Sequence, residues 1–364
     1  MLRGIATEID LEAAKSNLKT VRAAAGGLPA IAVVKADAYG HGAAALGAAF
    51  LKAGADMLAV AFISEARELR ESGIKSPILV LFDTSEPEAF FELGLTPVIH
   101  DLKSAGLLAK EAERRATTLD IHVKVDTGMG RMGLDDPALL SLIADLRNIR
   151  IAGIMSHLSD ADATDKAFSL EQVRRFSAIC DELKSRGITP MRHLANSAAS
   201  LGIPEAGFDA IRPGIALYGI SPFADRDVAG LRPVMRATAR IIALRKIKKG
   251  NPVSYARTFI TKRDTVAAVI AAGYADGYPR SLSNKAGVLV GGRRAPIMGR
   301  VCMDLFVVDV TEIPEAKLMQ EVVLMGSEGA ESIGAAELAE AAGTIPYEIL
   351  LMLGRNSNRK VAAA

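Results

Sequence analysis

A lysine directly after an apolar, strand-like run is the first residue whose position suggests chemistry. Lys35 follows residues 30–34, and the next seven residues read ADAYGHG, a turn of small residues that leaves room for a ligand and includes Tyr39. Burial disfavours the charged form of an amine, so a lysine held there can form a Schiff base and carry protons near neutral pH. An isolated lysine at a strand end usually just extends its ammonium group to solvent. The turn after Lys35 is what favours a catalytic amine.

Polar and apolar side chains alternate in residues 121–126, IHVKVD. The alternation puts His122, Lys124 and Asp126 on one face of a strand. In a barrel this face points inward, where a charge is unfavourable unless it is paired. We expect Arg131, on the following loop, to be the partner. A purely structural ion network is the alternative, and it competes most strongly for Lys124.

Three further polar segments follow later strand-like runs. His157 comes after residues 151–155, Asn196 and Ser197 open a short helix, and Gly214 follows Arg212-Pro213. Backbone amides at a helix start and in a glycine turn bind phosphate, and barrels often place a phosphate site after strands seven and eight. Arg212 is the cation nearest this expected site, where it could contact phosphate or form a surface ion pair. For His157 a structural role is equally compatible.

The elements that must position these residues alternate between strand and helix. Eight strands are expected, at residues 31–34, 57–60, 78–81, 96–99, 121–124, 151–155, 191–194 and 209–212. Alternating βα units imply a parallel sheet covered by helices, and eight of them fit a closed (β/α)₈ barrel of the TIM type over residues 12–231. A doubly wound open sheet is the alternative, but no Gly-x-Gly-x-x-Gly follows the first strand.

After residue 231 the pattern changes to short strands separated by turns. The expected strands are 237–244, 265–271, 287–290, 295–298 and 305–310, with Gly291-Gly292 as a hairpin turn. Long helical patterns are nearly absent before 334–342. We therefore expect a mostly β domain over residues 232–364. Residues 1–11 read as a strand that could join either domain, and we place it with the β domain.

Composition excludes several classes of protein. The 364 residues are 50% apolar and 24% charged, which is typical of a folded globular chain, and the formal charge of +2 without a dense basic tract argues against nucleic acid or a membrane surface as partner. No apolar run reaches the ~18 residues of a membrane span, and acidic residues occupy the place of a signal peptide's apolar core. Two cysteines, Cys180 and Cys302, make no disulfide framework. We expect a cytoplasmic protein and no metal site.

Several motifs resemble those of the alanine racemase family and follow one another in the family's order. They occupy residues 32–42, 122–133, 156–158, 195–198, 212–219, 253–255 and 303–304. The likeness covers nearly the whole chain, and chance agreement of so many motifs is negligible. It implies the barrel and β domain, pyridoxal phosphate as cofactor, alanine as substrate, and a head-to-tail homodimer with active sites shared across the interface.

The resemblance also implies roles for individual residues. Lys35 would hold the cofactor through a Schiff base and exchange the proton on the D-side of the substrate, and Tyr255 of the partner subunit would exchange the proton on the L-side. The cofactor would also be contacted by Tyr39, His157, Asn196, Ser197, Arg212, Gly214, Ile215 and Tyr347. The substrate carboxylate would meet Arg131, Met303 and Asp304. The access channel would be lined by Asp162, Tyr274, Arg280 and Arg300.

Two of these implications concern charge. Arg212 would face the pyridine nitrogen of the cofactor, and an arginine keeps its proton, so the ring nitrogen would stay largely unprotonated and transamination would be suppressed. In some members of the family the residue matching Lys124 is carbamylated. Here that modification would turn a buried cation into an anion beside Arg131.

The chain departs from the family pattern at three places. Ala256 stands where glycine often follows the tyrosine, Phe82-Asp83 ends the third strand where many members are richer in glycine, and residues 355–359 lack the common Arg-Val-Pro-Arg run. The last of these leaves local contacts of the dimer or channel open.

Other functions on the same barrel remain as alternatives. A non-catalytic cofactor-binding protein would resemble the first domain only, so the β domain with Tyr255 argues against it. A decarboxylase with the same cofactor would supply a cysteine from the partner's β domain, but the residues around Cys302 fit the racemase. A broader substrate range, and the choice between supplying D-alanine for peptidoglycan and degrading alanine, stay open.

Overall fold

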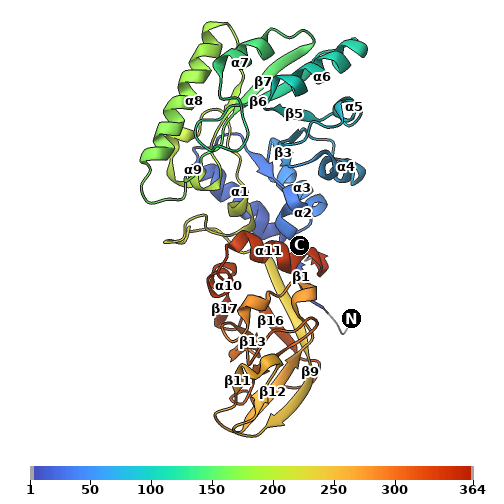
Figure 1. Ribbon diagram of the computed structural model, residues 1–364, viewed down its shortest axis with the longest axis vertical. Helices are drawn as coiled ribbons and strands as arrows, with labels where there is room; N and C mark the ends of the chain where they lie inside the picture. The colour runs from blue at the N-terminus through green and yellow to red at the C-terminus, as the bar shows by residue number, and fades with distance from the viewer. Residues whose placement is uncertain (1–3, 362–364) are drawn as a thin grey trace. The chain divides into compact units, whose positions relative to one another are not determined.

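The computed structural model describes residues 4–361, which form two compact units. One unit holds residues 14–38 and 43–232, and the other holds the chain up to residue 13, residues 39–42 and the chain from 233 onward (Figure 1). Residues 39–42, expected inside the barrel domain, thus group with the β unit. The reason is close backbone packing, because a Cβ on Gly40 would lie 2.9 Å from the carbonyl oxygen of Leu350.

The first unit is built on a seven-stranded parallel sheet in sequential order. Its strands are β2 (Ile31–Val33), β3 (Met57–Val60), β4 (Ile78–Val80), β5 (Thr96–Ile99), β6 (Leu119–Lys124), β7 (Ile149–Met155) and β8 (Met191–His193). These confirm the first seven expected strands. Strands such as IAV and ILV are apolar at every position because a parallel sheet is covered on both faces.

The eighth expected strand is reduced to two isolated bridges. Ala210 bridges to His193 and Ile211 bridges to Ala30, so residues 210–211 connect the last strand of the sheet to the chain just before the first. The Ile211 amide donates to Pro29 (2.9 Å), and the Ile31 amide donates to Ile211 (2.8 Å). The Val33 amide still donates to the carbonyl of Pro213 (3.0 Å), but Pro213 has no amide proton to donate in return, and the ladder ends there. The curled sheet with its helices confirms the barrel-type fold.

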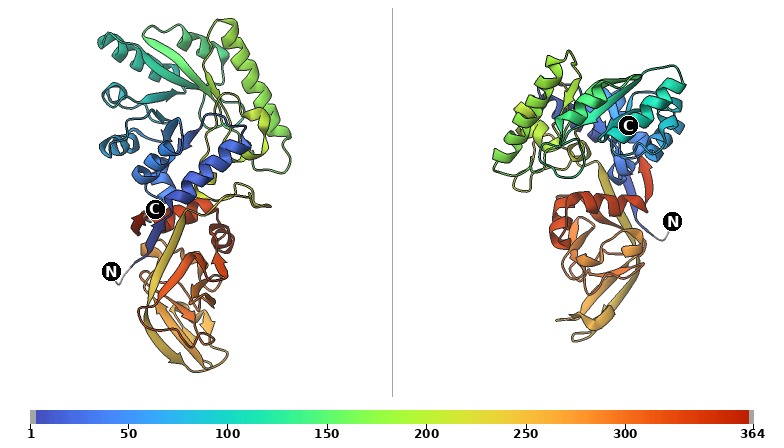
Figure 2. Two further views of the ribbon diagram at one scale, coloured as in Figure 1. Left: turned by 180° about the vertical axis from the view of Figure 1, so that it is seen from behind. Right: turned by 45° about the horizontal axis from the view of Figure 1, so that its top comes forward.

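Helices connect the strands and lie along the outside of the sheet (Figure 1, Figure 2). They are α1 (Leu11–Ala24), α2 (Lys35–Gly40), α3 (Ala43–Lys52), α4 (Ile63–Glu71), α5 (Pro87–Glu92), α6 (Leu102–Arg114), α7 (Pro137–Ala144), α8 (Ala167–Ser185) and α9 (Ser197–Gly202), with 3₁₀ turns at Pro204–Ala206 and Ile215–Tyr218. Among residues 4–361, none of the helices is both long and apolar enough to span a membrane.

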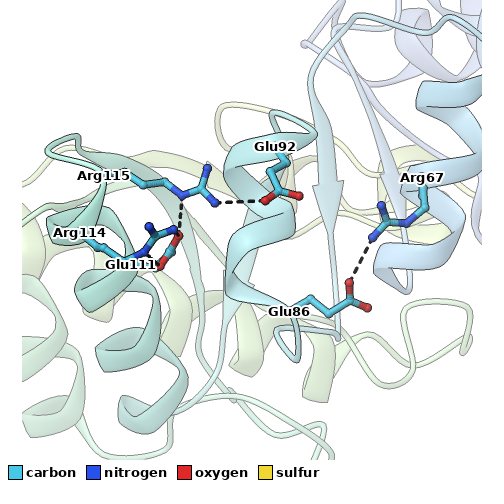
Figure 3. Close-up of polar contacts among 6 residues, drawn as sticks. All are labelled: Arg67, Glu86, Glu92, Glu111, Arg114 and Arg115. Carbon is cyan, nitrogen blue, oxygen red and sulfur yellow. Dashed lines mark hydrogen bonds and ion pairs between the residues drawn. The ribbon is translucent and has the colours of Figure 1, made fainter.

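Ion pairs connect neighbouring helices on the outer surface of this unit (Figure 3). Arg115 contacts Glu111 on α6 and Glu92 on α5, and Arg67 on α4 contacts Glu86 just before α5. The pairs of Glu92 and of Arg67 with Glu86 are solvent-exposed on at least one side and add little to stability, whereas Glu111 is buried. The unit is held together mainly by its buried apolar strands.

The second unit contains a nine-stranded, mostly antiparallel sheet. Its strands are β1 (Ala6–Ile9), β9 (Met235–Ile247), β12 (Thr265–Ile270), β13 (Gly287–Val290), β14 (Arg293–Pro296), β15 (Phe306–Asp309), β16 (Glu321–Glu328), β17 (Glu331–Ile333) and β18 (Asn358–Val361). A separate hairpin pairs β10 (Pro252–Val253) with β11 (Phe259–Ile260), 3₁₀ turns occupy Tyr255–Arg257, Tyr274–Asp276 and Arg280–Leu282, and the helices are α10 (Ala335–Ala342) and α11 (Pro346–Arg355).

Local sequence signals account for two features of this sheet. β13 and β14 pair around Gly291-Gly292, both at positive φ as the tight turn requires, so the expected hairpin is confirmed. β1, the strand read from residues 1–11, pairs antiparallel with β9 and parallel with β18. Residues 1–3 of that segment lie outside the described residues, as do residues 362–364 of the expected β domain.

Candidate active site

Lys35 begins a short helix that is left-handed. Ala36, Asp37, Ala38 and Tyr39 all have φ between 52° and 54°. The left-handed conformation costs about 1–2 kcal/mol for each residue that carries a Cβ, so such a turn persists only where its surroundings hold it. The Ala38 amide donates to the Val34 carbonyl (2.8 Å), and Asp37 accepts from the Ala43 amide (2.7 Å). The strain marks this turn as a place where the structure serves something other than stability.

The amine of Lys35 is half-buried, and its protonated form is disfavoured. Burial, followed by the nearby charge of Arg131, lowers the pKa of Lys35, and the charge of Glu65 partly opposes this. A lowered pKa enlarges the fraction of neutral amine near pH 7, and the neutral amine is the nucleophile.

Three cations surround the ring of Phe82 at the end of β4. The amines of Lys35 and Lys124 each lie 5.4 Å from the ring centroid, and the guanidinium carbon of Arg131 lies 5.8 Å from it. Contact with a ring face stabilises a cation. Burial first, and then the charges of Arg131 and Arg212, lower the pKa of Lys124 to about 8.

The expected pairing of Asp126 with Arg131 is wrong. The carboxylate of Asp126 instead accepts from the amides of Gly128, Met129 and Gly130, each at 2.8 Å. The loop returns to the end of β6, where Leu134 pairs with Lys124 and Asp126. Its backbone amides therefore lie close to the carboxylate of Asp126 and take the place of the Arg131 side chain as hydrogen-bond donors. Arg131 is left to lie over Phe82 with the two lysines.

Arg212 is buried at the centre of a polar network. Its Nη1 donates to Nδ1 of His193 (2.9 Å), and its Nη2 donates to the carbonyl of Ser156 (2.7 Å) and, at 3.5 Å, to Nδ1 of His157. Burial lowers the pKa of Arg212 to about 9, which still leaves the guanidinium charged at pH 7. Among the bonds made by residues 4–361, Nε takes no part, so this donor is left for a ligand.

The histidines around Arg212 are held neutral. Burial, and then the charge of Arg212, lower the pKa of His157 to about 3 and that of His122 to about 4. His193 accepts from Arg212 through Nδ1, so its Nε2 carries the proton and donates to Nδ1 of His122 at 2.8 Å. The hydrogen bonds from Arg212 to His193 and from His193 to His122 fix the tautomer of His193, and both histidines in this series are neutral rather than anionic.

The expected phosphate-binding residues fall into two groups. In the barrel unit, the hydroxyl of Ser197 accepts from the amides of Gly214 (2.9 Å) and Ala216 (3.3 Å), while Asn196 caps α9 by accepting from the Ala199 amide (3.0 Å). Ile215 lies between those two amides. In the β unit, the rings of Tyr39 and Tyr347 lie 5.9 Å apart. The structure thus gathers each group within its own unit.

Tyr255 lies on a strained, exposed loop of the β unit. Its side chain is 72% exposed, and the neighbouring residues Ser254, Ala256 and Arg257 have φ of 64°, 58° and 52°. The hydroxyl of Ser254 donates to the carbonyl of Arg300 at 2.7 Å. A Cβ on Gly299 would lie 2.6 Å from the carbonyl oxygen of Val253, so only glycine allows this approach. The loop is therefore presented to solvent but anchored at its base.

The loops that carry the other expected residues of the β unit are bonded together. The amides of Tyr274 and Ala275 donate to the carbonyls of Cys302 (3.1 Å) and Met303 (2.9 Å). The carbonyl of Arg300, two residues before Cys302, accepts from the Ser254 hydroxyl. Arg280 is the first residue of the 3₁₀ turn Arg280–Leu282. Met303 is 54% exposed. Asp162, in the barrel unit, lies on the exposed loop after β7.

Two family models together match nearly the whole chain. The model of the alanine racemase N-terminal domain matches residues 9–222, and that of the C-terminal domain matches residues 234–361. The chain belongs to the alanine racemase family. The alanine racemase of Thermodesulfovibrio yellowstonii is 48% identical over 332 residues, which are 91% of this chain and 89% of that protein.

Solved alanine racemases have the same fold. That of the D-cycloserine producer Streptomyces lavendulae gives a TM-score of 0.95 at 33% identity, covering 100% of this chain and 98% of that one. That of Bartonella henselae, solved with covalently bound pyridoxal phosphate, gives 0.90 at 30% identity and covers 99% of both. The resemblance seen in the motifs is thereby confirmed.

The structure gives roles to residues for which neither the motifs nor the resemblance to alanine racemases implied one. Glu65 bonds to the turn of Lys35, Phe82 lies among three cations, and His193 supports Arg212. Glu65 carries only the local signal of a helix start, Phe82 only that of a departure from the family pattern, and His193 carries none. Their roles depend on contacts between strands far apart in the sequence.

Ala256 gives a prediction at the position where alanine racemases often carry glycine. Its φ of 58° favours glycine, so Ala256→Gly should raise the free energy of unfolding, by up to about 1 kcal/mol. Urea unfolding of both proteins measures it. Ala342→Gly, in helix α10, is the matched control and should lower stability. Loss of stability in both variants would show that Ala256 is not strained.

Proposed function

We propose that this protein interconverts L-alanine and D-alanine with Lys35 and Tyr255 as its two proton carriers. The activity is that of its family, pyridoxal-phosphate-dependent racemisation. The observation that carries the assignment of Lys35 is its half-buried amine of lowered pKa, at the start of a strained turn in the barrel mouth. Removing a proton from one face of a carbon and returning one to the other requires two carriers in different places.

The residues of the barrel unit fit the cofactor. Lys35 supplies the amine, and Arg212 supplies an unused Nε donor. For phosphate, Ser197 supplies a hydroxyl group and Ile215 an amide, beside Gly214, whose own amide bonds to Ser197. Tyr39 and Tyr347 add two phenol groups in the β unit. When bound, pyridoxal phosphate supplies the electron sink that stabilises the electron pair left on the substrate carbon.

The chain's own groups then move the protons. The Nζ of Lys35 takes or returns the proton on the D-side, and the Oη of Tyr255 does so on the L-side. Arg131 and the loop of Met303 and Asp304 contact the region of the substrate carboxylate. His157 and Asn196 contact the cofactor. Asp162, Tyr274, Arg280 and Arg300 line the channel by which alanine enters.

We also propose a homodimer in which Tyr255 reaches the partner's Lys35. The exposure and anchoring of the Tyr255 loop support this, because an exposed tyrosine on a fixed loop is suited to an interface. A cytoplasmic location remains a prediction from the sequence.

Arg212→Glu should lower racemisation and raise transamination. A carboxylic acid can give a proton to the ring nitrogen, which strengthens the electron sink, whereas the guanidinium of Arg212 keeps its proton. The ratio of pyruvate formed to alanine racemised measures the effect. Because the variant buries a different charge, cofactor content and thermal unfolding serve as controls. An unchanged ratio in a folded, cofactor-loaded variant would remove this role.

Carbamylation of Lys124 is a further proposal for this site. A pKa of about 8 leaves part of the amine neutral at pH 7, and the neutral amine can add to carbon dioxide with loss of one proton. The resulting anion would relieve the crowding of Lys124, Arg131 and Arg212. The bound fraction should rise with pH, because deprotonation precedes the reaction. Intact mass, or ¹³C NMR in labelled bicarbonate, tests it, and an unmodified Lys124 in bicarbonate at pH 8 would disprove it.

The first test of the activity is circular dichroism of L-alanine and, separately, D-alanine incubated with the cofactor-loaded protein. Both signals should decay to zero. Persistent signals from both, with the cofactor bound to Lys35, would assign the chain another substrate or a binding role.

A further inference from the structure

Three backbone amides converge on the carboxylate of Glu65. Its Oε2 accepts from the amides of Ala61 (2.7 Å) and Phe62 (3.3 Å), and its Oε1 accepts from the amide of Ala36 (2.6 Å). Ala61 and Phe62 precede helix α4, which contains Glu65, whereas Ala36 belongs to the turn of Lys35 on the neighbouring strand. One side chain therefore joins two connections of the barrel.

Helix capping explains only part of this arrangement. A glutamate at the third helical position commonly accepts from the amide of the residue that precedes the helix, here Phe62. The bond from Ala36 lies outside any such cap. It also meets a left-handed turn in which four successive residues with side chains are strained. A charge-assisted bond at the first of them is well placed to hold the turn in that conformation.

Two charged side chains shift the pKa of Lys35, and Glu65 is the negatively charged one. Arg131 approaches from the loop after β6, and Lys124 approaches from β6 itself, where its charge and that of Lys35 act on each other. The carboxylate of Asp83 accepts from the amides of Ile63 and Ser85, and that of Asp126 accepts from the amide of Gly128. Glu65 opposes the effect of Arg131 and raises the pKa of Lys35.

We propose that Glu65 is a positioning residue for Lys35, holding its left-handed turn through the Ala36 amide and supplying the negative charge that balances Arg131. The proposal rests on the proposed function, in which Lys35 is the amine that binds the cofactor. Glu65 touches neither cofactor nor substrate in this role and acts through Lys35 alone.

Three variants of the full-length protein distinguish the effect of the length of the Glu65 side chain from the effect of its charge. Glu65→Gln keeps the length of the side chain and removes its charge, whereas Glu65→Asp keeps the charge and shortens the side chain. Glu68→Gln, the control, removes an exposed charge three residues further along the same helix. Both Glu65 variants should lower kcat about tenfold or more, with a smaller change in KM, because the amine is misplaced rather than the substrate lost. Glu68→Gln should match the wild type.

The charge is tested by the pH dependence of covalent pyridoxal phosphate uptake at Lys35 in the cofactor-free chain. The uptake rate rises as the amine loses its proton. Glu65→Gln should shift the midpoint to lower pH, because the anion that favours the protonated amine is gone, and Glu65→Asp should leave it near the wild-type value. A Glu65→Gln midpoint and kcat equal to those of the wild type would overturn the proposal, as would equal shifts in Glu68→Gln.

Hydrogen exchange gives a readout that does not depend on the cofactor. The amide of Ala36 should exchange faster in both Glu65 variants than in the wild type or Glu68→Gln, and unchanged exchange would overturn the proposal. If the wild type takes up no cofactor at Lys35, the proposed function fails, and the exchange result still decides whether Glu65 holds the turn.

Discussion

Lys35→Ala should abolish racemisation of both enantiomers of alanine, with a loss of about 10³-fold or more. In the proposed mechanism, the substitution removes both the amine that binds the cofactor and the proton carrier of one face. The Nζ of Lys35 lies 5.4 Å from the ring centroid of Phe82. The charged groups of Lys124 and Arg131 lie over the same ring. Lys124 belongs to β6 and Arg131 to the loop after β6, so neither side chain can take the place of Lys35 on the turn after β2. Initial rates by circular dichroism, with each enantiomer as substrate, measure the loss.

The control for this experiment is a lysine outside the site. Lys52→Ala changes an exposed residue at the end of α3 and should leave the rate within about twofold. Cofactor content and thermal unfolding of Lys35→Ala show whether the chain is folded. Racemisation by a folded Lys35→Ala protein within tenfold of the wild type would contradict the assignment of the amine.

Tyr255→Phe should also lower racemisation, by about 10²–10⁴-fold, because it removes only the hydroxyl that we propose as the proton carrier of the L-side. The ring stays on its exposed loop, and the anchor from Ser254 to Arg300 is untouched. Cofactor binding through Lys35 should persist. A Tyr255→Phe protein that racemises normally would remove Tyr255 from the mechanism.

Pairing the two inactive variants tests whether the active site is shared between subunits. In a heterodimer of Lys35→Ala and Tyr255→Phe chains, a shared site leaves one of the two sites with both carriers, so about half of the wild-type activity should return. Co-expression with two affinity tags isolates the heterodimer, and each variant purified alone is the control. No return of activity would place Lys35 and Tyr255 of one site in the same chain.

Much of the barrel could be predicted from the sequence because its signals are local. Apolar strands of three to seven residues alternate with helices, and a buried parallel strand such as IAV must be apolar at every position. The hairpin at Gly291-Gly292 followed from a turn that only glycine adopts easily. The end of the ladder was less predictable, since residues 209–212 read as a strand and form only two bridges.

The candidate site could be predicted only as a set of residues, not as an arrangement. The motifs identified Lys35, Arg131 and Arg212, but the partner of Asp126 was wrong because backbone amides compete with side chains and leave no trace in residue types. The left-handed turn after Lys35 was also not foreseen, since small residues are compatible with several conformations. Its strain is tolerated only where distant groups hold it.

The order of the elements and the family of the chain follow from the sequence alone, and so do the candidates for proton carriers, because periodicity and motifs lie within short stretches. The tertiary structure alone decided the bond from Ala36 to Glu65, the gathering of three cations around Phe82 and the tautomer of His193. Each of these joins residues about 20 to 70 positions apart, and each depends on the distance and direction between side chains that only the packed strands set.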